Sequence, residues 1–235
     1  MSDEERETEN GEVTNTTPES ETDMPEVADD KGEETTFRAT NSDPIFGLVL
    51  AGAISIGLSP IIDTDANMRY SIVWGMLALF GVLAWLFGTA PRIEEEDPIN
   101  LAWGFVFGLV LSIPVLAFVG GTLTEISEAL FPDLRAGTVL AYLIFVMPLA
   151  ETLFFRALIQ QNYAFWLTAL MCSVWQTVLF FPLLNQGPLP LITAIILLMA
   201  NLLFGYVRNR NGLAAAWVCQ ITVNIMLLFM PFAGL

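Results

Sequence analysis

Apolar residues dominate the chain from residue 43 onward, in runs of about 20 residues separated by short polar stretches. A run of about 20 apolar residues is long enough to cross the hydrocarbon core of a bilayer as an α-helix. The pattern predicts seven such helices, at 44–62, 70–90, 99–120, 138–160, 163–183, 189–207 and 213–234. The expected fold class is therefore an all-α integral membrane protein, with about seven transmembrane helices in a bundle.

One segment between the apolar runs has a different pattern. Residues 121–137, GTLTEISEALFPDLRAG, are too polar to span a bilayer. Leu123, Ile126 and Leu130 are spaced to share one side of a helix. The segment is expected to form a short helix that lies at the membrane interface.

The first 42 residues differ in composition from the rest. They hold 14 of the 25 acidic residues and only three basic ones, so they carry −11 of the formal net charge of −16. Such a segment buries too little apolar surface to fold, so residues 1–42 are expected to be a disordered acidic tail before a membrane domain at 43–235. The tail is either a docking segment for a basic partner or, as acidic runs favour, a solvated extension suited to a halophilic cytoplasm.

The positions of the basic residues predict the orientation. The tail has no apolar segment of the signal-peptide kind, so its end is expected to stay on the side of synthesis. With seven spans and the N-terminus in the cytoplasm, six basic residues fall inside, and only Arg69 and Arg135 fall outside. The excess favours a cell-membrane protein with a cytoplasmic N-terminus and an external C-terminus.

Two charged residues lie within the fourth apolar run, in the stretch MPLAETLFFRALIQ at 147–160. In an α-helix, Glu151 and Arg156 lie about 140° apart, so they are not an ideal pair. Arg156 is close enough to the end of the run to extend to the interface. Glu151 lies about 13 Å deeper than that end and is expected to face the bundle interior. It is either a structural hydrogen-bond acceptor or a functional group.

Amide side chains recur in the later runs. Gln220 and Asn224 are four residues apart, and Trp217 precedes Gln220 by three, so all three share a helix face. Gln176 and Asn201 are further interior candidates in the fifth and sixth runs. These amides either join helices to one another or serve a carboxyl group or peptide in a shared cavity.

Three of these stretches, in order, resemble the motifs of one membrane family. ETLFFRALI at 151–159 resembles the motif EExxxR, and SVWQTVLF at 173–180 resembles FxxxH with Trp175 as the aromatic residue. FGYVRNRNGLAAAWVCQITVN at 204–224 resembles the third region, with its HxxxN pattern. Residues of about 138–228 thus resemble the core of the CPBP family, the CAAX-type prenyl proteases and Abi-like intramembrane proteases.

The resemblance implies roles for four residues. Glu151 matches the glutamate proposed to activate the attacking water, and Arg156 matches the motif arginine. Asn224 matches the asparagine proposed to help hold the oxyanion, and Gln220 stands at a histidine position beside it.

The departures from the family pattern are chemically severe. Thr152 replaces the second glutamate, Leu179 replaces the histidine of the second motif, and Gln220 replaces that of the third. The chain contains no histidine at all, whereas a zinc site needs about three protein ligands. Family members use zinc in some cases, but no metal or other cofactor is expected here. The two cysteines, Cys172 and Cys219, are expected to be small buried residues.

The leading hypothesis is a pseudoenzyme: a CAAX protease-like membrane protein with weak or lost proteolysis. It would bind a hydrophobic or lipidated peptide, or another membrane protein, within the bilayer and would not bind nucleic acid. The residues expected to contribute to binding are Thr152, Trp175, Gln176 and Trp217. One alternative is an active endopeptidase with Glu151 as general base and Gln220 and Asn224 as oxyanion donors. Another is a small transporter or channel component.

Overall fold

The computed structural model describes residues 43–58, 66–86, 97–184 and 187–235. The acidic tail expected at 1–42 lies outside the described residues. Within the described ranges the chain is almost entirely helical and contains no strand, which confirms the all-α fold class. The helices are α1 (Asp43–Gly57), α2 (Ala66–Leu86), α3 (Pro98–Leu130), α4 (Ala136–Ala141), η2 (Tyr142–Val146), α5 (Met147–Glu151), η3 (Thr152–Ile159), α6 (Gln160–Asn162), α7 (Phe165–Phe180), η4 (Phe181–Leu183), α8 (Leu189–Asn211), α9 (Leu213–Asn224), η5 (Ile225–Phe229) and α10 (Met230–Phe232).

Six segments of the described chain are long and apolar enough to cross a membrane. They are Asn67–Leu86, Pro98–Leu130, Ala136–Asn162, Phe165–Leu183, Leu189–Asn211 and Leu213–Phe232. The span expected at 44–62 forms α1, which has 15 residues and is thus about 22 Å long. That length falls short of a hydrocarbon core of about 30 Å.

The short helix expected within 121–137 forms the second part of α3, beyond a kink at Val119, and its position at a membrane interface stays a prediction. Helix α3 continues through it to Leu130, with a break in the helical backbone at Val119 (φ −128°, ψ 18°). Leu123, Ile126 and Leu130 share one side as expected, but each is only 1% exposed. The second half of α3 bends inward because this side can be buried against the bundle.

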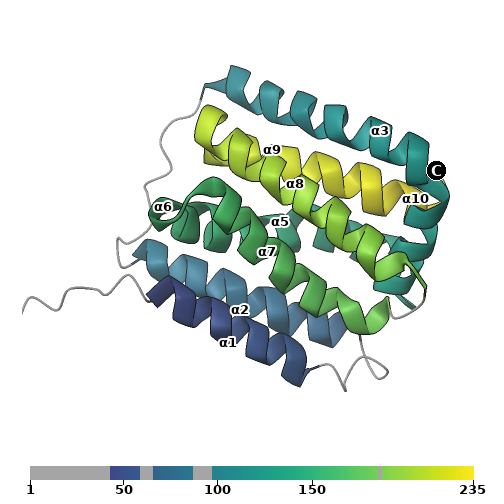
Figure 1. Cartoon of the computed structure of the whole chain (residues 1–235), viewed down its shortest axis with the longest axis horizontal. Coiled ribbons are helices and arrows are strands. Elements are labelled where there is room, and N and C mark those ends of the chain that lie inside the picture. Colours follow the sequence, from purple (N-terminus) through teal and green to yellow (C-terminus); the bar gives the residue numbers. More distant parts are fainter. Residues whose placement is uncertain (1–42, 59–65, 87–96, 185–186) are drawn as a thin grey trace, which may run out of the picture. The chain divides into compact units, whose positions relative to one another are not determined.

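Helix α9 lies between α3 and α8, and α8 also lies beside α7 (Figure 1). Glycines allow α3 and α9 to approach closely. A Cβ atom on Gly104 would lie 2.2 Å from the carbonyl oxygen of Ala215, and one on Gly108 would lie 2.7 Å from Cβ of Thr222. Small residues at helix contacts are typical of membrane bundles, where close packing contributes to association.

The turn between α8 and α9 consists of one residue. Gly212 has φ 99° and ψ 176°, a left-handed conformation that a side chain would strain. Its backbone N–H donates to the carbonyl oxygen of Arg208 and ends α8. The tight turn makes α8 and α9 antiparallel neighbours and brings their polar residues toward the same interior.

The fourth apolar run, Ala136–Asn162, is not a uniform α-helix. Two stretches within it, η2 and η3, have π-helical hydrogen bonding. Pro148 lies between them and supplies no backbone N–H, which disturbs the i→i−4 ladder there. In a π-helix the hydrogen bonds join residues five apart, so the turn is wider than in an α-helix. The π-helical stretch η3 begins immediately after Glu151 and contains Arg156.

Candidate functional site

Glu151 is the last residue of α5 and its side chain is fully buried. Three side chains donate hydrogen bonds to its carboxyl group. Nε1 of Trp74 on α2 lies 3.1 Å from Oε1. Nε2 of Gln176 on α7 and Nε2 of Gln220 on α9 lie 2.9 and 2.6 Å from Oε2. The expectation that Glu151 faces the bundle interior is confirmed, because its neighbours come from three other helices.

Arg156 does not extend to the membrane interface, and that expectation is wrong. Its side chain is 1% exposed and donates a hydrogen bond to Oδ1 of Asn201 on α8. Its guanidinium carbon lies 5.6 Å from the centre of the Phe204 ring, within the range of a cation–π contact. The wide turn of η3 explains the difference, since residues five apart come closer to the same side in a π-helix than in an α-helix.

Asn201 joins Arg156 to the groups around Glu151. Its Nδ2 donates to Oε1 of Gln176 at 2.6 Å and to Oγ of Ser173 at 3.0 Å. Asn201 is 1% exposed and Gln176 is 4% exposed. The two amides therefore form a buried bridge between the guanidinium of η3 and the carboxyl group of α5.

The other motif residues lie near this bridge with different contacts. Thr152 donates from its hydroxyl to Oε1 of Gln220 over 3.4 Å. Asn224 does not bind Glu151; its Nδ2 donates to the backbone carbonyl of Leu143, 3.1 Å away. The structure thus brings Glu151, Gln220 and Thr152 together, whereas Asn224 hydrogen-bonds to a different group.

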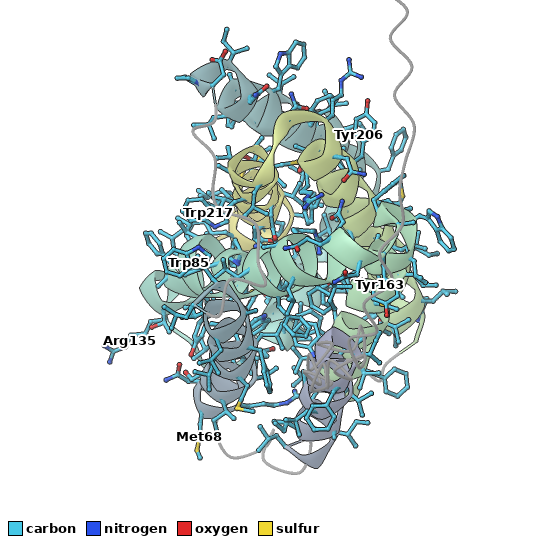
Figure 2. All side chains as sticks on the ribbon, turned by 90° about the vertical axis from the view of Figure 1, so that its left-hand side faces the viewer. Met68, Trp85, Arg135, Tyr163, Tyr206 and Trp217 are labelled. Carbon is cyan, nitrogen blue, oxygen red and sulfur yellow. The ribbon has the colours of Figure 1, made fainter. Side chains whose placement is uncertain are left out.

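Neither predicted binding tryptophan reaches Glu151. Trp175 is buried, with its ring 5.6 Å from that of Phe155 and 6.5 Å from that of Trp74. Trp217 lies on α9 and is half-buried (Figure 2). Within the described part of the chain, both indole N–H groups lack a hydrogen-bond partner.

Leu179, at the position of a family histidine, belongs to the apolar core. Its side chain is fully buried, and its backbone carbonyl accepts a hydrogen bond from Arg69. Arg69 was expected in an external loop, but it lies in α2 and is 1% exposed. It thus places a cation near the C-terminal end of α7, where the helix dipole favours positive charge. Arg135, in contrast, points away from the bundle (Figure 2).

A small cavity borders the polar residues. This inner cavity has a volume of about 50 Å³, and Gln176, Asn201, Gln220 and Asn224 lie in its otherwise mainly apolar wall. Thr193 also lines it, with a hydroxyl that has no partner among the described residues. Since one water molecule needs about 10–15 Å³ by this measure, the inner cavity has room for a few waters.

A second, larger groove is lined by a different set of residues that includes Trp74. This lateral groove runs between α2 and the segment α4–α5 and has a volume of about 520 Å³. Asn67, Ser71, Thr138 and Tyr142 line its polar end, and Gly75, Ala78, Ala141, Phe145, Val146 and Leu149 line the remainder. Trp74 lies in its wall and also donates to Glu151, so one indole separates the groove from the carboxyl group.

Sequence reasoning missed Trp74. It lies in an apolar helix with no motif near it, and a tryptophan in a membrane span has many ordinary uses. Its only signal was the N–H group, which needs an acceptor when buried. Asn201 was recognised as an interior candidate, but its link to Arg156 depended on the π-helical turn.

The zinc ion that the family resemblance implies does not fit this site. All three groups that contact Glu151 present N–H donors, whereas a metal ion requires lone pairs from its ligands. Within the described residues, no three cysteine, aspartate or glutamate side chains gather where they could hold a metal ion. The chain has no histidine to complete such a set.

The helices and the buried polar cluster define a multi-pass membrane protein with an intramembrane site. Residues 134–226 match the family model described as type II CAAX prenyl endopeptidase Rce1-like, which confirms the resemblance stated from the motifs. The chain is therefore similar to CAAX proteases over residues 134–226, within its membrane-spanning part. Neither the curated proteins nor the solved structures gave a significant match.

Proposed function

We propose that this protein binds a hydrophobic or lipidated peptide, or a hydrophobic segment of another membrane protein, in the lateral groove, with weak or lost proteolysis. The observation that carries the proposal is the contrast in size between the two spaces that are lined by hydrogen-bond donors to Glu151. The lateral groove, at about 520 Å³, lies within the range of ligand-binding pockets. The inner cavity, at about 50 Å³, is too small for a peptide. A ligand can thus occupy the groove without reaching Glu151.

The groove lining indicates the chemistry of the ligand. No charged side chain lines it. The polar end lies where α2 and α4 begin, and the apolar residues lie farther along both helices. Tyr142 contributes a hydroxyl group that is 2.6 Å from that of Ser71. This arrangement favours an uncharged, hydrogen-bonding part such as a peptide backbone at one end and an apolar chain along the remainder. It offers nothing that would attract nucleic acid.

A substitution at Gly75 tests the groove. Gly75 lines the groove, and a Cβ atom added there meets no atom within 4 Å, so Gly75→Leu fills the space without a clash. We expect a fluorescent farnesylated peptide to bind the wild type in nanodiscs and to bind Gly75→Leu at least tenfold more weakly. Gly52→Leu is the matched control, because Gly52 also has open space at Cβ but does not line the groove. Equal binding by all three proteins would contradict the proposal.

A peptidase assay tests the proteolytic part. Gln220 donates to Glu151 and Asn224 donates to a backbone carbonyl, so neither is free to hold an oxyanion. We expect little cleavage of a lipidated peptide by the wild type. Robust cleavage that Glu151→Ala abolishes would instead establish the endopeptidase alternative, with Glu151 as general base and a water molecule from the inner cavity as nucleophile. The transporter hypothesis stays a prediction.

We also propose that the protein lies in the cell membrane with its C-terminus external. Arg92, Arg208 and Arg210 fall on one side of the six long helices, and Arg135 falls on the other. The basic residues of the tail favour a cytoplasmic N-terminus, which requires the short α1 to cross the membrane. Accessibility of a C-terminal tag in intact cells tests the orientation, and a tag that antibodies reach only after permeabilisation would reverse it.

A further inference from the structure

A chain of hydrogen bonds connects Arg156 to Glu151 through two amides, and in each bond the donor lies on the Arg156 side. A guanidinium group can only donate, so its bond to Asn201 requires the oxygen of that amide to face it. The nitrogen of Asn201 then faces Oε1 of Gln176 at 2.6 Å. The nitrogen of Gln176 in turn donates to Glu151 at 2.9 Å. Each amide is thus oriented by the one before it, starting from the cation.

The remaining contacts of Glu151 agree with this direction. Trp74 can only donate through its indole nitrogen. Gln220 accepts from Thr152 with its oxygen and donates to Glu151 with its nitrogen. The carboxyl group therefore receives three N–H donors, and no acceptor faces it among the described side chains. This is the environment of an anion, because a protonated carboxyl group would need an acceptor for its own hydrogen.

Burial makes an opposite charge necessary. Glu151 is fully buried and Arg156 is 1% exposed, so neither charge is solvated by bulk water. An isolated ion in such a place is costly, whereas an opposite charge and hydrogen bonds offset the cost. Arg156 uses only Nη2 in this way, since its Nε and Nη1 have no partner among the described residues. Among the described residues no hydrogen bond joins the two charged groups directly, and they are connected through the chain Arg156–Asn201–Gln176–Glu151.

We propose that Glu151 is a carboxylate whose counter-charge is Arg156, connected through the amides of Asn201 and Gln176, and that this relay takes the place of a metal ion at this site. The groups around Glu151 donate hydrogen bonds and do not coordinate zinc because the negative charge of Glu151 is balanced by Arg156. Arg156 and Asn201 act as positioning residues, since they reach Glu151 only through Gln176. The proposal does not depend on a ligand in the lateral groove.

A metal measurement on the wild-type full-length chain tests the replacement. We expect the protein purified without chelator to contain much less than one zinc or manganese ion per chain. We also expect neither added Zn²⁺ nor EDTA to shift its melting temperature in detergent. A stoichiometric metal, or a melting temperature that falls with EDTA and recovers with Zn²⁺, would overturn the proposal. This measurement requires no variant.

A double-mutant cycle tests the charge coupling. Glu151→Gln and Arg156→Met each leave one buried charge without its counterpart, so each is expected to lower the melting temperature by at least about 6 °C. The double variant removes both charges and is expected to recover at least half of the summed loss. Arg210→Met, which removes an exposed arginine of α8, is the control and should change the melting temperature by no more than about 2 °C. Losses that simply add would contradict the coupling.

The cycle also remains informative if a single variant fails to fold. A double variant that can be purified when Arg156→Met cannot shows the same coupling. The protonation state of Glu151 can be measured independently from the difference between the infrared spectra of the wild type and Glu151→Gln. We expect this difference to contain the bands of a carboxylate. The C=O stretch of a protonated acid in their place would overturn the proposal, whatever the peptide-binding assay shows.

Discussion

Gln176 and Gln220 line the inner cavity and Trp74 lines the lateral groove, and all three donate hydrogen bonds to Glu151. The two spaces differ in almost every property. The inner cavity is about 50 Å³, and its polar wall consists of amides already engaged with one another or with the backbone. The lateral groove is about 520 Å³, with polar side chains at one end and several exposed apolar ones along it. The comparison teaches that the buried polar cluster serves first to balance charge, while the space for a ligand lies outside it.

We expect the largest effect from a substitution in the wall of the inner cavity. Asn201→Leu removes the acceptor of Arg156 and a donor to Gln176 and Ser173. Because it leaves a buried guanidinium and a buried amide unpaired, we expect a loss of about 3 kcal/mol or more in the free energy of unfolding. Thermal unfolding in detergent measures the loss, and Asn162→Leu at the exposed end of α6 serves as control. A change below about 1 kcal/mol would mean that the amide bridge contributes little.

The next effect concerns Trp74, which lines the lateral groove and contacts Glu151. Trp74→Phe keeps an aromatic ring but loses the N–H donor to Glu151. We expect a loss of about 1–2 kcal/mol, between the usual value for a bond to a charged group and the smaller one found within membranes. Trp166→Phe, at a residue that is 56% exposed, should have no measurable effect. If the two variants unfold alike, the indole bond is not a significant part of the site.

The smallest expected effect comes from a substitution that tests whether the inner cavity holds water. The Thr193 hydroxyl lacks a partner in the described structure, so the isosteric Thr193→Val should be neutral or stabilise by up to about 1 kcal/mol if the cavity is dry. Thr222→Val is the matched control, because it removes a hydroxyl that donates to the Val218 carbonyl at 2.9 Å. Thermal unfolding compares the two, and a clear destabilisation by Thr193→Val would indicate a bound water molecule near the relay.

The hydrophobic pattern predicted most of the fold because segment length and apolar content largely determine membrane spans. It did not predict that the short helix after Val119 joins α3 across a kink and buries Leu123, Ile126 and Leu130. At the first run the described helix has 15 residues, and residues 59–62 of the expected span lie outside the described residues.

The candidate site was predictable in part. Glu151 stood out because a carboxyl group deep in an apolar run needs partners, and Gln176 and Gln220 were recognised by the same reasoning. Arg156 was misplaced because its position near the end of the apolar run suggested that it extends to the interface, whereas its guanidinium group is buried against Asn201 and Phe204. Trp74 was missed because nothing in its neighbourhood marks it as different from other tryptophans in membrane helices.

The sequence by itself determined the class of this protein: its apolar runs require membrane helices, its motifs are of the Rce1-like kind, and its lack of histidine removes the usual metal ligands. Only the tertiary structure decided how the buried charges are balanced and where a ligand fits. Both depend on side chains from helices that are far apart in the chain, and on a change of helical pitch after Glu151. Composition and spacing carry no record of these contacts, because they arise only when the helices pack.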